Sequence, residues 1–150
     1  MNKICRVAVA EDSADDFFLL ERCVRLAPAL RIVHHSTNGA DMIDYLAGQR
    51  DYAQRERFPL PDLVLLDLKM PICDGFEVLK WLQQHPMVKR PWIAVLSSSN
   101  EKRDVDQAKT LGADEYLIKP ATLEALTQIV QKLEAECVER ANYNLEAQTR

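Results

Sequence analysis

The chain has 150 residues, 47% of them hydrophobic and 28% charged, which fits one compact domain with a buried core. Its formal net charge is −4 and its basic residues are scattered, so the sequence lacks the basic surface that nucleic-acid-binding proteins carry. The first apolar run reaches acidic residues too early for a signal peptide, and no segment is long enough to span a membrane. The four cysteines form no CxxC pair, so we expect free thiols in a cytoplasmic protein that binds neither nucleic acid nor membranes.

The first half of the chain alternates short apolar runs with amphipathic segments. We predict strands at 4–10 and 30–36 and helices at 14–26 and 40–46. Phe18 and Leu19 exceed what a single buried stripe on the first helix requires, which indicates either wider burial or a surface for a partner. His34 and His35 are adjacent and point to opposite faces of their strand, so we assign neither of them to a site.

The segment 48–61 (GQRDYAQRERFPLP) has little helical periodicity, mixed charge and two prolines near its end, which predicts a loop. Connections between a helix and a strand usually have about 2–6 residues, and this one is longer. It is either an insertion without consequence or a loop that contacts a partner.

The second half continues the alternation. We predict strands at 62–66, 92–96 and 115–118 and helices from 75 to about 85, from about 101 to 111, and from 122 onwards. Asp74 is the expected N-cap of the first of these helices, and Ser98 or Asn100 that of the second. Gly112 is expected to end the second helix.

Five strand–helix units in succession predict an α/β fold, with a doubly wound parallel sheet in the strand order 2-1-3-4-5. Polar residues follow four of the five strands: Glu11 and Asp12 follow the first, Asp67 the third, Ser97 the fourth and Lys119 the fifth. In this order the first and third strands flank the switch point of the topology, so three carboxylates should meet in one crevice.

Three neighbouring carboxylates would repel one another by roughly 4 kcal/mol per pair at an effective dielectric constant near 20, and a divalent cation would relieve this repulsion. Hard oxygen ligands favour Mg²⁺. Lys119 and Ser97 add a positive charge and a hydroxyl, which suit a phosphoryl group, and Asp67 is the best candidate nucleophile. Taken singly, Asp12 or Ser97 could cap a helix and Lys119 could be a surface amine, but four matching strand ends favour a site.

With these residues in view, the sequence from about 4 to 133 resembles the receiver domains of two-component response regulators. The resemblance rests on the following motifs: Glu11-Asp12, Asp67 with Met70-Pro71-Ile72-Cys73-Asp74-Gly75, Ser97, and Lys119-Pro120. It implies a flavodoxin-like (CheY-like) fold that consists of a receiver domain at 1–133 and an extension at 134–150, which could continue the last helix. A stripe through Cys137, Ala141 and Leu145 could support a homodimer, and fraying in solvent is the alternative.

The same resemblance implies roles for individual residues. Asp67 would be the phosphoacceptor, and Mg²⁺ would be held by Asp12, Asp67 and the backbone carbonyl of Lys69, with Glu11 often acting through water. Ser97 and Lys119 would contact the phosphoryl oxygens. Tyr116 would be the aromatic residue whose rotation is coupled to Ser97, and the Lys119–Pro120 peptide bond would usually be cis.

The resemblance implies a phosphorylatable switch rather than an enzyme with its own substrate. A sensor histidine kinase or a phosphotransfer protein would supply the phosphoryl group, and a downstream protein would bind at helix four, strand five and helix five. The long segment 48–61 also resembles single-domain regulators of bacterial phytochrome-type kinases.

Two other classes of function stay open. A haloacid-dehalogenase-type phosphohydrolase typically has a second Asp two residues after its nucleophile, where this chain has Lys69. A phosphate-independent docking domain on the receiver scaffold often lacks one acid or the lysine, and this chain keeps them all.

Overall fold

The computed structural model describes residues 3–148, except for the side chains of residues 145, 146 and 148. The sheet has five strands in the order β2-β1-β3-β4-β5, and every neighbouring pair is parallel. The predicted fold and strand order are therefore confirmed. The strands are β1 (Cys5–Ala10), β2 (Leu30–Ser36), β3 (Leu63–Leu66), β4 (Trp92–Ser97) and β5 (Glu115–Ile118). The helices are α1 (Ala14–Arg25), α2 (Gly39–Ala47), the 3₁₀ helix η1 (Arg50–Ala53), α3 (Gly75–Gln84), α4 (Lys102–Thr110) and α5 (Leu123–Gln148).

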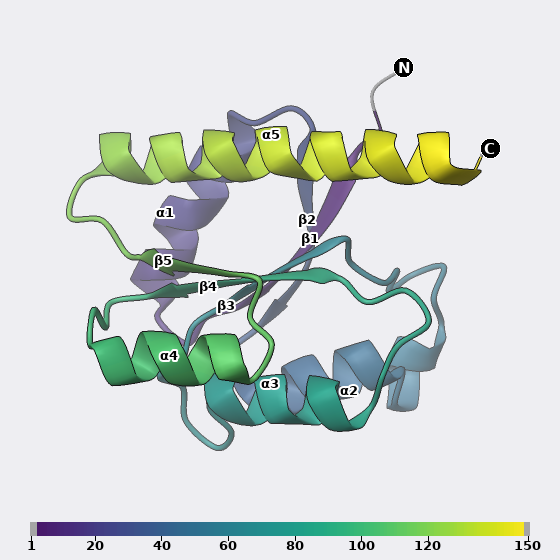
Figure 1. Ribbon diagram of the computed structural model, residues 1–150, viewed down its shortest axis with the longest axis horizontal. Helices are drawn as coiled ribbons and strands as arrows, with labels where there is room; N and C mark the ends of the chain where they lie inside the picture. The colour runs from purple at the N-terminus through teal and green to yellow at the C-terminus, as the bar shows by residue number, and fades with distance from the viewer. Residues whose placement is uncertain (1–2, 149–150) are drawn as a thin grey trace.

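Helices cover both faces of the sheet (Figure 1). Helices α1 and α5 lie on one face, and α2, α3 and α4 lie on the other. The central strand β3 contributes alternate residues to the two cores, because Leu63 and Leu65 belong to the first apolar cluster and Val64 and Leu66 to the second. A strand buried on both faces needs no polar alternation, which explains the continuous apolar run in the sequence.

The ends of the α-helices follow local capping chemistry in most places. Asp74 caps α3 as predicted, because its side chain accepts a hydrogen bond from the N–H of Glu77 at 3.0 Å. Neither Ser98 nor Asn100 caps α4. The N-cap of that helix is Glu101, whose side chain makes no capping hydrogen bond. Its own N–H donates to Ser99 Oγ at 3.3 Å, which is a local side-chain contact just before the helix.

The segment 48–61 is more ordered than a loop, because it contains η1 and packs against α2. The guanidinium of Arg55 donates to the carbonyl oxygen of Tyr45 at 2.8 Å, and the hydroxyl of Tyr52 donates to the Asp41 carboxylate at 2.7 Å. The expectation of a plain loop is thus wrong for η1. The 3₁₀ helix is held by these contacts with α2. Such contacts do not produce a periodic pattern in the sequence of the segment, so the pattern could not predict the helix.

Two apolar side chains of α1 are exposed. Phe18 is 62% exposed and Leu19 is 39% exposed, so the wider burial considered for this helix is wrong. Leu19 lines a small cavity of about 60 Å³ together with Lys119 and Pro120. The remaining explanation from the sequence, a partner surface on α1, stays a prediction.

Helix α5 is a single helix of 26 residues. Its buried stripe consists of Leu126, Val130, Leu133 and Cys137. One turn further on, the guanidinium of Arg140 lies 4.6 Å from the centre of the Trp92 ring. The side chain of Leu145, expected to continue the stripe, lies outside the described residues. None of the described helices combines the length and the apolar character that crossing a membrane requires.

Candidate functional site

The candidate site lies at the carboxyl edge of the sheet, where backbone hydrogen bonds continue the ladder past the strand ends. The N–H of Asp67 donates to the carbonyl of Ala10 at 3.0 Å, and the N–H of Glu11 donates to that of Ser36 at 2.9 Å. The N–H of Lys119 donates to the carbonyl of Ser97 at 2.8 Å. These bonds fix the backbone from which the site side chains project, so their positions follow from the strand order.

The ammonium group of Lys119 joins residues from three segments. Its Nζ atom lies 2.6 Å from Glu11 Oε1, 3.0 Å from Asp67 Oδ2 and 2.9 Å from Asp16 Oδ2. The side chains of Lys119, Glu11 and Asp67 are 17%, 6% and 8% exposed, whereas Asp16 is 46% exposed. The predicted convergence of Lys119 with the acids therefore occurs, and Asp16 is an additional member.

Asp16 was missed by the sequence analysis, and no local signal distinguishes it. Acidic residues are common in the first turn of a helix because they stabilise the helix dipole, and Asp16 stands in the first turn of α1 beside Asp15. Only the folded chain shows that its partner is Lys119.

The acidic side chains of Glu11, Asp12 and Asp67 form a cluster. One carboxylate oxygen of each lies within 4.8 Å of the others, with Asp12 exposed and the other two buried. Oxygen donors at this spacing fit a hard divalent cation. Lys69, two residues after Asp67, donates its N–H to Asp67 Oδ1 at 3.3 Å, so the chain turns back over the acid. The role of the Lys69 carbonyl stays a prediction.

The charges in this cluster shift two pKa values. Burial raises the pKa of Glu11 to about 7, and the Asp67 charge acts in the same direction, while the hydrogen bond from Lys119 opposes them. Burial alone would lower the pKa of Lys119, but its hydrogen bonds to Glu11 and Asp16 and the charge of Asp67 outweigh burial and raise that pKa well above its usual value. Lys119 is therefore firmly cationic, and Glu11 is readily protonated near neutral pH.

Ser97 and Tyr116 meet at a shared neighbour rather than at Asp67. Ser97 is fully buried, and its Oγ atom accepts a hydrogen bond from the N–H of Ser99 at 3.2 Å. The Tyr116 hydroxyl donates to the carbonyl oxygen of Ser99 at 2.8 Å. The backbone of Ser99 thus links the two residues that the resemblance couples, and the Ser99 hydroxyl also donates to Asp104 at 2.5 Å.

The turn after Asp67 depends on close backbone approach. A Cβ atom at Gly75 would lie 2.4 Å from the carbonyl oxygen of Asp67, so only glycine allows α3 to begin there. Ile72 in the same turn is exposed and has a φ of +69°, a backbone conformation that residues with a Cβ atom rarely adopt.

The Lys119–Pro120 peptide bond is trans, contrary to the resemblance-based expectation. The trans form of a peptide bond before proline is intrinsically favoured by about 0.5–1 kcal/mol.

Comparison with known proteins adds independent findings. The response regulator receiver domain family matches residues 7–131. Response regulator Rcp1 of Synechocystis sp. is 32% identical over 129 residues, which are 86% of each chain.

Solved structures of similar proteins agree with this match. The phosphorylated cyanobacterial phytochrome response regulator RcpA is 32% identical, with a TM-score of 0.77, over 87% of this chain and 91% of that chain. The Mn²⁺-bound form of response regulator Rcp1 is 31% identical, with a TM-score of 0.78, over 90% of this chain and 95% of that chain. The resemblance seen in the sequence, including that to phytochrome regulators, is confirmed.

Proposed function

From the premise that this chain belongs to the response regulator receiver domain family, we propose that it accepts a phosphoryl group on Asp67 and thereby changes its binding to a downstream protein. The donor would be a sensor histidine kinase or a phosphotransfer protein, in the cytoplasm. The observation that carries this proposal is the position of Lys119 Nζ, 3.0 Å from Asp67 Oδ2 and 2.6 Å from Glu11 Oε1 at the carboxyl edge of the sheet.

We further propose that phosphorylation requires Mg²⁺, held by Glu11, Asp12, Asp67 and the backbone carbonyl of Lys69. The clustered carboxylate oxygens support a divalent cation, and a similar protein was solved with Mn²⁺. When bound, such an ion neutralises the carboxylates and the phosphoryl oxygens. The chain itself supplies the nucleophile and the second positive charge.

A carboxylate oxygen of Asp67 would attack the phosphorus atom of the donor, and the bond from phosphorus to the donor nitrogen would break as the acyl phosphate forms. The new group brings about −1.5 to −2 charges and three acceptor oxygens. Lys119 donates a hydrogen bond to Asp67 in the unphosphorylated structure, and after phosphorylation it would donate to a phosphoryl oxygen instead. Ser97, at the end of the next strand, would donate its hydroxyl to another.

The contacts around Ser99 suggest how the change reaches the surface. If Ser97 turns toward the phosphoryl group, its hydrogen bond from the N–H of Ser99 breaks. The carbonyl oxygen of Ser99 accepts a hydrogen bond from the hydroxyl of Tyr116, so displacement of Ser99 would release the half-buried tyrosine. Phosphorylation shifts the equilibrium between the two side-chain packings only if the phosphoryl group interacts more favourably with one of them. If the two packings differ by only a few kcal/mol, this difference in interaction is large enough to change which packing dominates.

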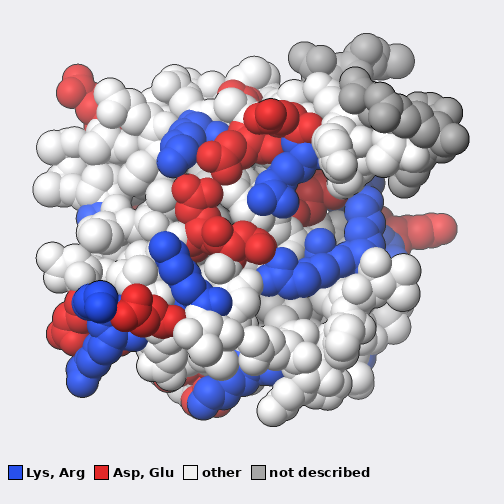
Figure 2. All heavy atoms as spheres, in the orientation of Figure 1, with Lys and Arg blue, Asp and Glu red and all other residues white. Residues whose placement is uncertain are grey.

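The output surface would be the face formed by α4, β5 and α5 (Figure 1). Figure 2, in the same orientation, shows acidic and basic side chains side by side on this face. The three elements carry ion pairs of their own, Lys132–Glu115 at 3.3 Å between α5 and β5 and Lys102–Asp106 at 3.7 Å within α4. Interspersed charge favours a protein partner over a nucleic acid, whose backbone would require a positive surface.

The test is phosphorylation by a small phosphodonor with and without Mg²⁺, followed by intact-mass measurement. The natural chain should gain one phosphoryl group in Mg²⁺ and none in EDTA, and Asp67→Asn should gain none. Asp106→Asn, at an exposed acid of α4, is the matched control and should be labelled like the natural chain. Labelling of Asp67→Asn would contradict the proposal. Turnover of a generic phosphatase substrate would favour the phosphohydrolase alternative, and a natural chain that stays unlabelled would favour the docking domain.

We also propose that the chain divides into a receiver domain at 1–133 and an extension at 134–150, and that the extension supports a homodimer. Cys137 is buried and Arg140 stacks on Trp92, so a cut after Ala141 preserves this packing better than a cut at Leu133. Light scattering on both shortened chains tests the dimer. An unchanged oligomeric state after both cuts would remove the extension from consideration.

A further inference from the structure

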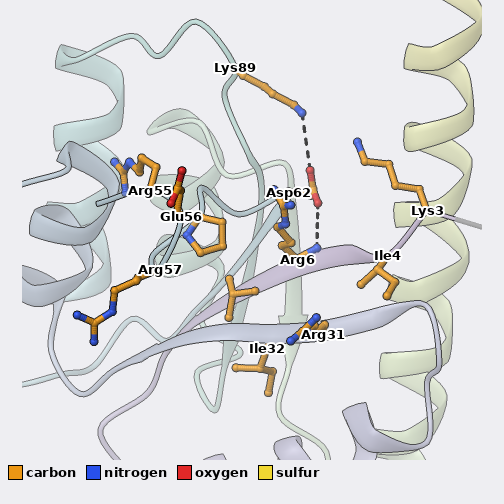
Figure 3. A pocket seen from close by; sticks show the side chains of 12 residues that line it. Lys3, Ile4, Arg6, Arg31, Ile32, Arg55, Glu56, Arg57, Asp62 and Lys89 are labelled. Carbon is orange, nitrogen blue, oxygen red and sulfur yellow. Dashed lines mark hydrogen bonds and ion pairs between the residues drawn. The ribbon is translucent and has the colours of Figure 1, made fainter. Parts of the chain in front are cut away.

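A second concave feature lies at the amino edge of the sheet, at the opposite ends of the strands from Asp67. It is a depression of about 800 Å³ between the starts of β1 and β2, the segment that follows η1, and the connection from α3 to β4 (Figure 3). We call it the basic depression. Six cationic side chains line it: Lys3, Arg6, Arg31, Arg55, Arg57 and Lys89. Glu56 and Asp62 are its two acids, although the whole chain has a net charge of −4.

Several of these cations are free to bind a ligand. The side chains of Lys3, Arg6 and Arg31 form no ion pair with another residue that the structure describes, and Figure 3 shows them around one space. Arg57 is likewise without an ionic partner in the described chain, and its guanidinium lies 5.4 Å from the centre of the Phe58 ring. Four cations from three segments therefore line the depression without an ion-pair partner in the described chain.

Three of the other charged groups in the basic depression, Arg55, Asp62 and Lys89, are already engaged. Arg55 donates to the backbone carbonyl oxygens of Tyr45 and Leu46 at 2.8 and 3.0 Å, which is a structural task. Asp62 accepts a hydrogen bond from the N–H of Arg6 at 2.9 Å and lies 4.0 Å from the Lys89 amine. This acid is therefore occupied by the backbone and by one lysine, and it leaves the remaining cations uncompensated.

The shape and the apolar lining narrow the class of ligand. Small-molecule sites usually have volumes of about 300–1,000 Å³, and the depression falls in this range. Ile4, Ile32, Val33 and Pro59 contribute apolar surface between the cations. Guanidinium groups bind phosphate oxygens in pairs, so several cations around one depression suit a ligand that carries more than one anionic group.

We propose that the basic depression binds a ligand with two or more linked phosphate groups, either a nucleotide or free polyphosphate. The apolar residues would accept the base of a nucleotide, while the arginines would contact the phosphates. A strand of six residues spans roughly 20 Å, so β1 separates this site from Asp67 and binding requires neither Asp67 nor a divalent cation. The proposal does not rest on the proposed function.

The test is calorimetric titration in EDTA at low salt with ATP, tripolyphosphate and AMP. The chain should bind ATP and tripolyphosphate better than AMP, and raising the salt concentration should weaken the binding. Tighter binding of ATP than of tripolyphosphate would identify a nucleotide site, and equal binding a site for the phosphate chain alone.

Charge-removing variants decide whether binding occurs in the basic depression. Arg31→Gln combined with Arg57→Gln should weaken the binding of tripolyphosphate at least about tenfold, which corresponds to about 1.4 kcal/mol. The matched control is Arg22→Gln with Arg103→Gln, at exposed positions of α1 and α4, and it should leave the affinity unchanged. Equal weakening in both pairs, or no binding by the natural chain, would overturn the proposal. A poly-glutamate peptide provides a further test. If it binds as tightly as tripolyphosphate and the Arg31→Gln, Arg57→Gln pair weakens both equally, the depression is a surface for an acidic protein, and the proposal is overturned.

Discussion

Replacing Lys119 with Met should destabilise the metal-free protein because it leaves the buried carboxylates of Glu11 and Asp67 without their cation. Two opposite unit charges about 3 Å apart attract by roughly 5 kcal/mol at an effective dielectric constant near 20, and desolvation offsets part of this. Removing one partner of a buried ion pair typically costs about 3–5 kcal/mol. Because the Lys119 side chain is 17% exposed, we expect the lower end of this range, about 3 kcal/mol at pH 8.

The loss should depend on pH because Glu11 titrates. Its pKa in the folded protein is about 7, above the ordinary value of 4.5, so the folded state binds a proton that the unfolded state releases between these values. The contribution of Glu11 to stability is therefore fully present below pH 4.5 and falls as the pH rises to 7. Without Lys119 this pKa rises further. At pH 5 Glu11 is protonated in both proteins, so the ion pairs that the variant loses are those with Asp67 and with the half-exposed Asp16, which together should cost about 1–2 kcal/mol.

The assay is urea denaturation in EDTA at pH 5 and pH 8, followed by circular dichroism. At pH 8 the melting temperature should also fall by roughly 6–12 °C, the shift expected for about 3 kcal/mol in a domain of this size. Lys132→Met is the matched control, since its pair with Glu115 is exposed and should contribute less than about 1 kcal/mol. A Lys119→Met variant as stable as the natural chain at pH 8, or equally destabilised at both pH values, would refute this reasoning.

Three further substitutions test contacts elsewhere. Tyr52→Phe removes the hydroxyl that binds Asp41 at 2.7 Å and should lower the free energy of unfolding by about 1 kcal/mol in urea titrations; no change would mean that η1 is held by packing alone. Gly75→Ala places a Cβ atom 2.4 Å from the Asp67 carbonyl oxygen, so intact-mass measurement should show slower phosphoryl uptake and thermal melting should show a loss of stability; normal uptake would show that α3 can shift without disturbing the site. Ser99→Ala removes two hydrogen bonds at the start of α4 and should speed hydrogen exchange of the first amides of this helix, whereas unchanged exchange would argue that the hydroxyl is dispensable.

Much of the fold was predictable because it follows from local patterns. The strands at 30–36 and 115–118 have the predicted bounds, and the N-cap of α3 is the predicted Asp74. Branched and apolar runs favour strands, and a side-chain oxygen before a helix satisfies its first amides, whatever the rest of the chain does.

The site was predictable to the extent that strand order determines it. Once the order is fixed, Asp67 and Lys119 must stand at the same edge, and they do. Asp16 was not predictable, because its partner is 103 residues away in the sequence. The cap of α4 was ambiguous for a different reason: the run from 97 to 100 consists of Ser and Asn, each of which can cap a helix. The observed N-cap is Glu101, and the Ser99 hydroxyl binds the N–H of Glu101 and the carboxylate of Asp104.

The length of α5 has a mechanical consequence. The helix begins four residues after Lys119 and continues for 26 residues, which is roughly 39 Å at 1.5 Å per residue. It extends across the whole width of the molecule (Figure 1), and a rigid tilt of about 5° at its start would move its far end by roughly 3 Å. A displacement too small to alter the packing beside Lys119 would be amplified at Tyr143, which a neighbouring molecule could sense.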